Sequence, residues 1–308
     1  MHRRKFLQQS SVGAAQLALV FGGARHALSA ETETAHSFTC TFAPHFGMFR
    51  HSAGSDLVDQ LKFAADHGFR AWEDNGMKSR PIAEQERIAQ AMERLNLQMG
   101  VISCTRGTSD KPTFTSEDAE LRRRVVAQIG QVVEVAKRVN TTWLTTILGD
   151  INPRLDHDYQ TALAADLLKA CCDVVEPHGM TLVLEPLNRL VNHPGKFLVY
   201  SPQAYALSKA VNRPSCKILF DIYHQQISEG NLIGNIDRAW DEIAYFQVGD
   251  APGRNEPGTG EINYANVFRH LRRRGYDGIL GMEHGNAQPG REGELAVIEA
   301  YRRVDPPR

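Results

Sequence analysis

Four side chains that carry oxygen ligand atoms follow short apolar runs in the second half of the chain. They are Glu185, Asp221, Gln247 and Glu283, separated by 36, 26 and 36 positions, each about the length of one strand and one helix. At the ends of parallel strands they would meet on one rim, where three carboxylates repel one another unless a cation lies between them. A hard, all-oxygen set favours Mg²⁺ or Mn²⁺ over zinc. The alternative is that each side chain only caps the helix that follows it.

Two further residues near these positions could bind a substrate. His224 stands three residues after Asp221 and could donate a hydrogen bond to a substrate oxygen. Arg254 lies within AYFQVGDAPGRNEPGTGEINY, the stretch from Ala244 to Tyr264, and could pair with a substrate carboxylate. Because glycines let the backbone approach a ligand closely, we interpret this loop as a wall of a small-molecule site rather than a solvated connection.

Short apolar segments alternate with segments of helical spacing from Ser37 onward. The pattern predicts strands at Ser37–Ala43, Phe69–Trp72, Leu97–Ile102, Thr142–Leu148, Met180–Leu184, Cys216–Phe220, Ile243–Val248 and Gly278–Met282. It predicts helices at Asp56–His67, Ile82–Leu95, Ser116–Val139, Asp156–Pro177, Ser201–Val211, Leu232–Trp240, Tyr264–Arg274 and Arg291–Tyr301. Glu73 and His45, after the second and first strands, are expected to support the site rather than to react.

Eight strand and helix pairs in about 270 residues predict an α/β fold, a single-domain (β/α)₈ barrel over residues 31–308. The rival is a doubly wound open sheet, which usually carries a glycine fingerprint after its first strand, and none follows Ser37–Ala43. In a barrel of this kind the chemistry lies at the carboxyl ends of the strands, where the four oxygen-bearing side chains fall.

Composition excludes several classes of protein. The chain of 308 residues is 42% hydrophobic and 23% charged, as expected of a globular domain with a full core. A net charge of −1 provides no basic field for a phosphate backbone, so no nucleic-acid partner is expected. Five cysteines, an odd number without metal-type spacing, predict no disulfide framework, although an incidental bridge stays open.

The first 30 residues differ from the rest of the chain. The paired Arg3 and Arg4 precede a mildly apolar run from Val12 to Phe21, and small residues follow at Leu28-Ser29-Ala30. This order is typical of a twin-arginine-type signal peptide and is too short for a stable membrane span. We therefore expect export to the periplasm, in a folded state that can already hold a cofactor; a basic amphipathic anchor is the alternative.

Four segments together resemble the hydroxypyruvate isomerase family, which belongs to the xylose-isomerase-like TIM barrels of sugar isomerases and epimerases. They are LVLEPLN at 182–188, FDIYHQQISEGNL at 220–232, the 244–264 loop and GMEHG at 281–285. The resemblance covers most of the chain from Ser37, and the loop is its most specific part. It implies that Glu185, Asp221, Gln247 and Glu283 are metal ligands, and that Glu185 and Glu283 move the proton.

The residues themselves suggest the same chemistry. Isomerisation of an aldose–ketose type removes a proton next to a carbonyl and gives an enediolate, whose charge a divalent cation can stabilise. Glu185 and Glu283, on either side of the substrate carbons, could take the proton from one carbon and return it to the next. Hydroxypyruvate would give tartronate semialdehyde. Two alternatives remain: a sugar or polyol epimerase or dehydratase, and an exported carbohydrate-binding protein without turnover.

Several properties stay open at this level. They are the natural keto acid or sugar, the choice between Mg²⁺ and Mn²⁺, the cleavage of the signal, and whether the protein forms a homo-oligomer.

Overall fold

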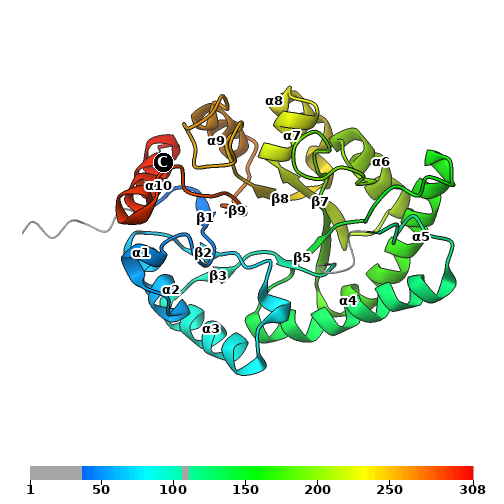
Figure 1. Ribbon diagram of the computed structural model, residues 1–308, viewed down its shortest axis with the longest axis horizontal. Helices are drawn as coiled ribbons and strands as arrows, with labels where there is room; N and C mark the ends of the chain where they lie inside the picture. Colours follow the sequence, from blue (N-terminus) through cyan, green and yellow to red (C-terminus); the bar gives the residue numbers. More distant parts are fainter. Residues whose placement is uncertain (1–36, 106–110, 308) are drawn as a thin grey trace, which may run out of the picture. The chain divides into compact units, whose positions relative to one another are not determined.

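The computed structural model describes residues 37–105 and 111–307, which belong to one compact unit spanning Ala35–Arg308. The predicted signal segment, residues 1–30, lies outside the described residues. Parallel strands form a ring with helices around it, as the alternating pattern predicts (Figure 1). Within the described part of the chain, no helix is both long and apolar enough to cross a membrane.

The described elements follow the predicted order with small changes in length. The strands are β1 Thr41–Ala43, β2 Ala71–Trp72, β3 Gln98–Met99, β4 Ile102–Ser103, β5 Trp143–Thr146, β6 Thr181–Leu184, β7 Cys216–Asp221, β8 Ile243–Gln247 and β9 Ile279–Gly281. The helices are α1 Arg50–Ala53, α2 Leu57–Asp66, α3 Ile82–Leu95, α4 Ala119–Val139, α5 His157–Val175, α6 Ser201–Val211, α7 Ile222–Ser228, α8 Leu232–Ala239, α9 Tyr264–Arg273 and α10 Gly290–Val304. The short helices α1 and α7 were not predicted.

One predicted strand is wrong as a single element. Leu97–Ile102 divides into β3, which pairs with β2, and β4, which pairs with β5. The division falls at Gly100, where a Cβ atom would lie 2.3 Å from the Tyr245 hydroxyl oxygen. A side chain from across the ring therefore occupies the space that a regular strand residue would need. A parallel bridge between His45 and Glu73 links the strand ends of β1 and β2 and continues the ring.

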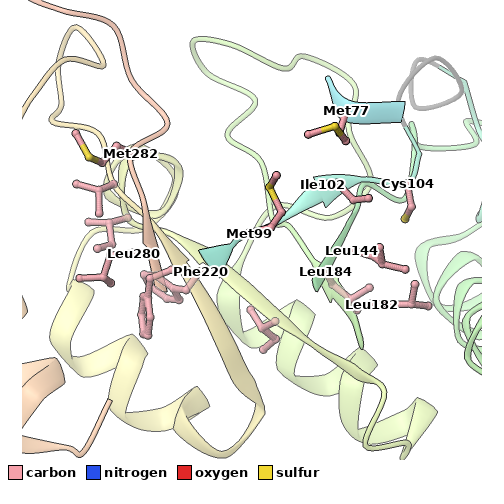
Figure 2. Close-up of a cluster of buried hydrophobic side chains, with 14 of the residues drawn as sticks. Met77, Met99, Ile102, Cys104, Leu144, Leu182, Leu184, Phe220, Leu280 and Met282 are labelled. Atoms are coloured by element: carbon pink, nitrogen blue, oxygen red, sulfur yellow. The ribbon is translucent and has the colours of Figure 1, made fainter. Parts of the chain in front are cut away.

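Alternation along the strands separates two apolar layers. Residues at every second position form the smaller cluster inside the ring: Ala43, Ala71, Val101, Val183, Leu219, Tyr245 and Ile279. Their neighbours along the strands, such as Leu182, Leu184 and Phe220, face outward and pack with helix residues in the larger core (Figure 2). The next inward position after Val183, Leu219 and Tyr245 is polar in each case, because side chains on a strand return to the same face every two residues. The inner apolar layer therefore lies directly below a layer of polar side chains at the strand ends.

Candidate active site

The strand ends bring the predicted residues to one rim of the ring. Asp221 on β7 is in register with Gln247 on β8, and Gln247 is in register with Gly281 on β9. Glu185 follows β6 directly, and Glu283 stands two residues beyond Gly281. Gln247 is fully buried and Glu185 and Asp221 are nearly so, whereas the Glu283 side chain is 31% exposed.

Three side chains form a tight cluster that could hold a cation. Glu185, Asp221 and His224 each offer a ligand atom, and these atoms lie within 4.8 Å of one another. His224 Nε2 is 3.8 Å from Glu185 Oε1 and 3.5 Å from Asp221 Oδ2. Asp221 Oδ1 accepts hydrogen bonds from the backbone N–H groups of Tyr223 and His224 at the start of α7. The capping interpretation is therefore true of one Asp221 oxygen, while the other faces the cluster.

The orientation of His224 is set by Asn188. Asn188 Oδ1 accepts hydrogen bonds from the backbone N–H groups of Val191 and Asn192, so its Nδ2 must face the other way. That Nδ2 lies 2.6 Å from His224 Nδ1, which must therefore accept the hydrogen bond. Burial lowers the pKa of His224 to about 3. A neutral imidazole of this tautomer carries its proton on Nε2, which has no hydrogen-bond partner among the described residues.

Arg254 brings positive charge to the carboxylates. Its Nη2 donates to Asp221 Oδ2 at 3.1 Å and to Glu283 Oε2 at 2.8 Å, and its Nε donates to the Glu283 carbonyl. The guanidinium also lies 4.9 Å from the centre of the Tyr223 ring. Two long-range ion pairs therefore hold Arg254 inside the site and not on the surface.

Asp250 organises the loop that carries Arg254. Its Oδ2 accepts hydrogen bonds from the backbone N–H groups of Gly258 and Gly260, and its Oδ1 accepts one from Ile262. A Cβ at Gly260 would lie 2.2 Å from the Ala251 carbonyl oxygen, so only glycine allows this close approach. The glycines and Asp250 of the 244–264 stretch are thus needed to fold the loop over the strand ends.

Gln247 makes a different contact from those of the three acidic residues. Its Nε2 donates to Glu73 Oε1 at 2.6 Å, while its Oε1 is buried without a hydrogen-bond partner in the described chain. Tyr245 donates its hydroxyl to Glu73 Oε2 at 3.0 Å. Asn75 Nδ2 lies 3.3 Å from Glu73 Oε1 and 3.1 Å from Glu283 Oε1, so it connects the two glutamates.

A cavity of about 210 Å³ opens above these residues. Its lining includes Glu185, His224, Arg254 and Glu283 together with Ser103, Thr145, His193 and Asn75. A second cavity of about 390 Å³ shares Asn75 and Glu283 and is otherwise lined by residues that follow β1 and β2, such as His45 and Arg80. A larger hollow of about 510 Å³ beside α3 is away from the strand ends, so volume alone does not identify the site.

Burial perturbs the glutamates of the rim. It raises the pKa of Glu185 well above its ordinary value, and the negative charges of Glu283 and Asp221 raise it further. Burial likewise raises the pKa of Glu283, an effect that Arg254 opposes. Each of these two carboxyl groups therefore holds its proton to a higher pH than an exposed glutamate does, and a further positive charge in the site would oppose this effect.

Of the three predicted acidic ligands, Glu185 and Asp221 belong to the tight cluster and Glu283 does not, and the structure adds partners that the sequence did not indicate. Glu185, Glu283, His224 and Arg254 line one cavity, and Asp221 contacts two of them. Gln247 lies beneath, against Glu73. The contacts of Asn75, Asn188 and Tyr245 were not predicted; the only signal was their place within two or three residues of a strand-end acid or amide.

Comparison with known proteins identifies the family. The sequence profile described as "Xylose isomerase-like TIM barrel" matches residues 61–304, most of the chain. The chain belongs to this family. The predicted barrel is confirmed, and the rival open sheet is excluded.

Similar curated sequences carry isomerase names. The chain is 29% identical to the putative hydroxypyruvate isomerase of Homo sapiens, over 75% of this chain and 84% of that protein. It is 32% identical to the 2-oxo-tetronate isomerase of Pectobacterium atrosepticum, over 74% of this chain and 86% of that protein. These matches bear out the resemblance to hydroxypyruvate isomerases and support an isomerase as the class of enzyme.

Solved structures agree on the architecture. A Brucella melitensis protein titled AP endonuclease, family 2, superposes with a TM-score of 0.73 at 26% identity, covering 85% of this chain and 99% of that one. The 3-keto-D-glucoside 4-epimerase of E. coli superposes with a TM-score of 0.70 at 18% identity, covering 86% and 98%. The second likeness concerns the fold alone.

Proposed function

We propose that this protein is a metal-dependent isomerase of small 2-keto hydroxy acids, with hydroxypyruvate and tartronate semialdehyde as the first pair to test. One observation carries the proposal: Glu185 and Glu283 line one cavity together with Arg254, and Arg254 pairs with both Glu283 and the buried Asp221. Several buried acids at one point are costly unless further positive charge offsets them.

The residues present fit a divalent metal. Gln247 Oε1 is a buried acceptor with no partner in the described chain, as expected of a carbonyl oxygen kept for a cation. The proposed ligands are Glu185, Asp221, Gln247 and Glu283, an oxygen set that suits Mg²⁺ or Mn²⁺. His224 belongs to the cluster but carries its proton on Nε2, so it is better suited to donate to a substrate oxygen than to bind a metal.

The chemistry assigns a role to each side chain. A bound divalent cation would supply positive charge where negative charge develops on the substrate oxygens. Glu185 and Glu283 lie on the β6 and β9 sides of the same cavity, so one can remove a carbon-bound proton and the other can deliver a proton to the neighbouring carbon. His224 Nε2–H would hold a substrate oxygen, and Arg254 its carboxylate.

A chelation and restoration experiment tests this function. Chelated enzyme should be inactive on 2-keto acids and keto-sugars, and Mg²⁺ or Mn²⁺ should restore activity on at least one keto acid. Glu283→Gln should keep bound metal but lose turnover, and solvent deuterium should enter the product of the native enzyme. Full activity after complete chelation would contradict the metal requirement.

An epimerase of larger ketoses is the second candidate, because the 390 Å³ cavity that shares Asn75 and Glu283 could receive a longer substrate. Turnover of keto-sugars with none of hydroxypyruvate would select it. A binding protein without turnover would instead keep its ligand affinity in Glu185→Gln and Glu283→Gln variants, with no deuterium incorporation.

We also propose that the protein is exported through the twin-arginine route, on the strength of residues 1–30 alone. Replacement of Arg3 and Arg4 by lysine should leave the protein in the cytoplasmic fraction. Equal periplasmic yield from the native and replaced sequences would contradict this proposal.

A further inference from the structure

Glu73 lies inside the barrel wall and has no part in the proton transfer proposed above. Its side chain is only 3% exposed and forms hydrogen bonds with Tyr245, Gln247 and Asn75. Glu73 follows β2 and Gln247 ends β8, and β1 and β9 lie between these strands in the ring, so the contact passes through the ring interior. Three hydrogen-bond donors therefore satisfy this buried carboxylate and fix its position.

The neighbouring strand β9 leaves room for this carboxylate. Gly281 on β9 is the inward-facing residue beside Gln247, and a Cβ there would lie 1.8 Å from Glu73 Oε2 and 3.2 Å from Gln247 Cγ. Every other residue type would therefore collide with Glu73 or push Gln247 aside. Because Gly281 has no side chain, the Glu73 and Gln247 side chains can pack against β9 at this position.

The pair decides which end of the Gln247 amide is free. A carboxamide binds a metal through its carbonyl oxygen, while its NH₂ group is repelled by a cation. Glu73 Oε1 accepts a hydrogen bond from Gln247 Nε2 at 2.6 Å, and a carboxylate cannot serve the carbonyl end in this way. The Oε1 atom is consequently left without a partner among the described residues.

We propose that Glu73 is a positioning residue for the metal centre: it holds the Gln247 amide so that the carbonyl oxygen faces the divalent ion. This inference rests on the proposed function, because it requires Gln247 to be a ligand. In this role Glu73 acts on the ion through Gln247 and makes no contact of its own with the ion. Residues that orient ligands in this way typically change metal affinity about 10–100-fold when they are replaced.

Titration of metal-free protein with Mn²⁺ in a calorimeter gives the readout, independent of turnover. Glu73→Met keeps the side-chain length but removes the acceptor, and it should raise the dissociation constant for Mn²⁺ about 10–100-fold. The matched control is Glu294→Met. Glu294 is equally buried and accepts from the backbone N–H groups of His51 and Ser52, away from both cavities. Its loss should lower the melting temperature but leave Mn²⁺ affinity unchanged.

An exchange of the two side chains separates orientation from packing. In the double variant Glu73→Gln with Gln247→Glu, the amide donates from position 73 and a carboxylate faces the ion from position 247. This variant should recover most of the affinity that Glu73→Met loses.

The outcomes distinguish the inference from the function on which it rests. Absence of Mn²⁺ binding by the native protein would refute the metal-dependent function and the inference together. Native Mn²⁺ binding with an unchanged dissociation constant in Glu73→Met would overturn the inference alone. Equal loss of affinity in Glu73→Met and Glu294→Met would reduce Glu73 to a structural role and overturn it as well.

Discussion

Replacement of Gly281 by alanine should be costly although it adds a single methyl group. The new Cβ would lie 1.8 Å from Glu73 Oε2 and 2.9 Å from its Cδ. To reach a carbon–oxygen separation of about 3.3 Å the carboxylate must withdraw by about 1.5 Å. That shift breaks the hydrogen bonds to Gln247 at 2.6 Å and to Tyr245 at 3.0 Å.

Overpacking of a buried site costs about 1–3 kcal/mol, so we expect the free energy of unfolding to fall by about 2 kcal/mol. In a domain of this size the melting temperature should fall by about 3–4 °C. Calorimetric melting of the metal-free protein measures the change. Gly130→Ala is the control, because its Cβ would meet Val174 at an ordinary 3.7 Å, and alanine suits the interior of α4 better than glycine. The control should melt at the native temperature or above it.

A double-mutant cycle tests the cause of this loss. Glu73→Ala removes the two carboxyl atoms that the new methyl group at position 281 would meet most closely and leaves Gln247 Cγ at 3.2 Å, so adding Gly281→Ala to that variant should cost much less than in the native protein. If Gly281→Ala destabilised the native and Glu73→Ala proteins by the same amount, the clash with Glu73 would not be its mechanism.

Three further results are expected. Arg254→Gln should tighten Mn²⁺ binding, since it removes the cation that occupies Asp221 and Glu283, and should raise KM for keto acids; weaker Mn²⁺ binding would contradict this. Burial raises the pKa of Cys104 from 9.0 to about 12, so its thiol should resist a disulfide reagent at pH 8 until the protein unfolds. Because the folded pKa is the higher one, the stability contributed by this thiol should be complete below pH 9 and disappear toward pH 12; fast labelling of folded protein would refute the burial. Leu182→Ala should lower the free energy of unfolding, measured with denaturant, by about 2–5 kcal/mol, because it leaves a cavity in the core. A decrease below about 1 kcal/mol would contradict this and indicate that the core around position 182 collapses into the space.

Much of the site follows from local pattern. Val183 and Glu185, Leu219 and Asp221, and Tyr245 and Gln247 are pairs two positions apart, so an inward apolar residue is followed by an inward polar one. Given parallel strands, these pairs alone predict one polar rim above one apolar layer. The glycine-rich loop after β8 was likewise predictable as a wall of the site.

Contacts across the ring were decided only by the tertiary structure. The alternation of side chains along β8 predicts that Gln247 points inward, but it does not predict that Glu73, after β2, accepts a hydrogen bond from its amide nitrogen. The break of the third strand at Gly100 depends on Tyr245, a residue far along the chain. Nor could spacing predict that Asn188 sets the tautomer of His224, or that Arg254 pairs with two of the acids.

The physical reason is the range of the interactions. The period of a strand and the turn chemistry of glycine act over a few residues, so the amino-acid sequence by itself determined the order of strands and helices and the face on which each acid lies. Hydrogen bonds and charge pairs between side chains depend on distances that exist only after the ring has closed. The partner of each buried polar group, and with it the detailed chemistry of the rim, was therefore decided by the fold.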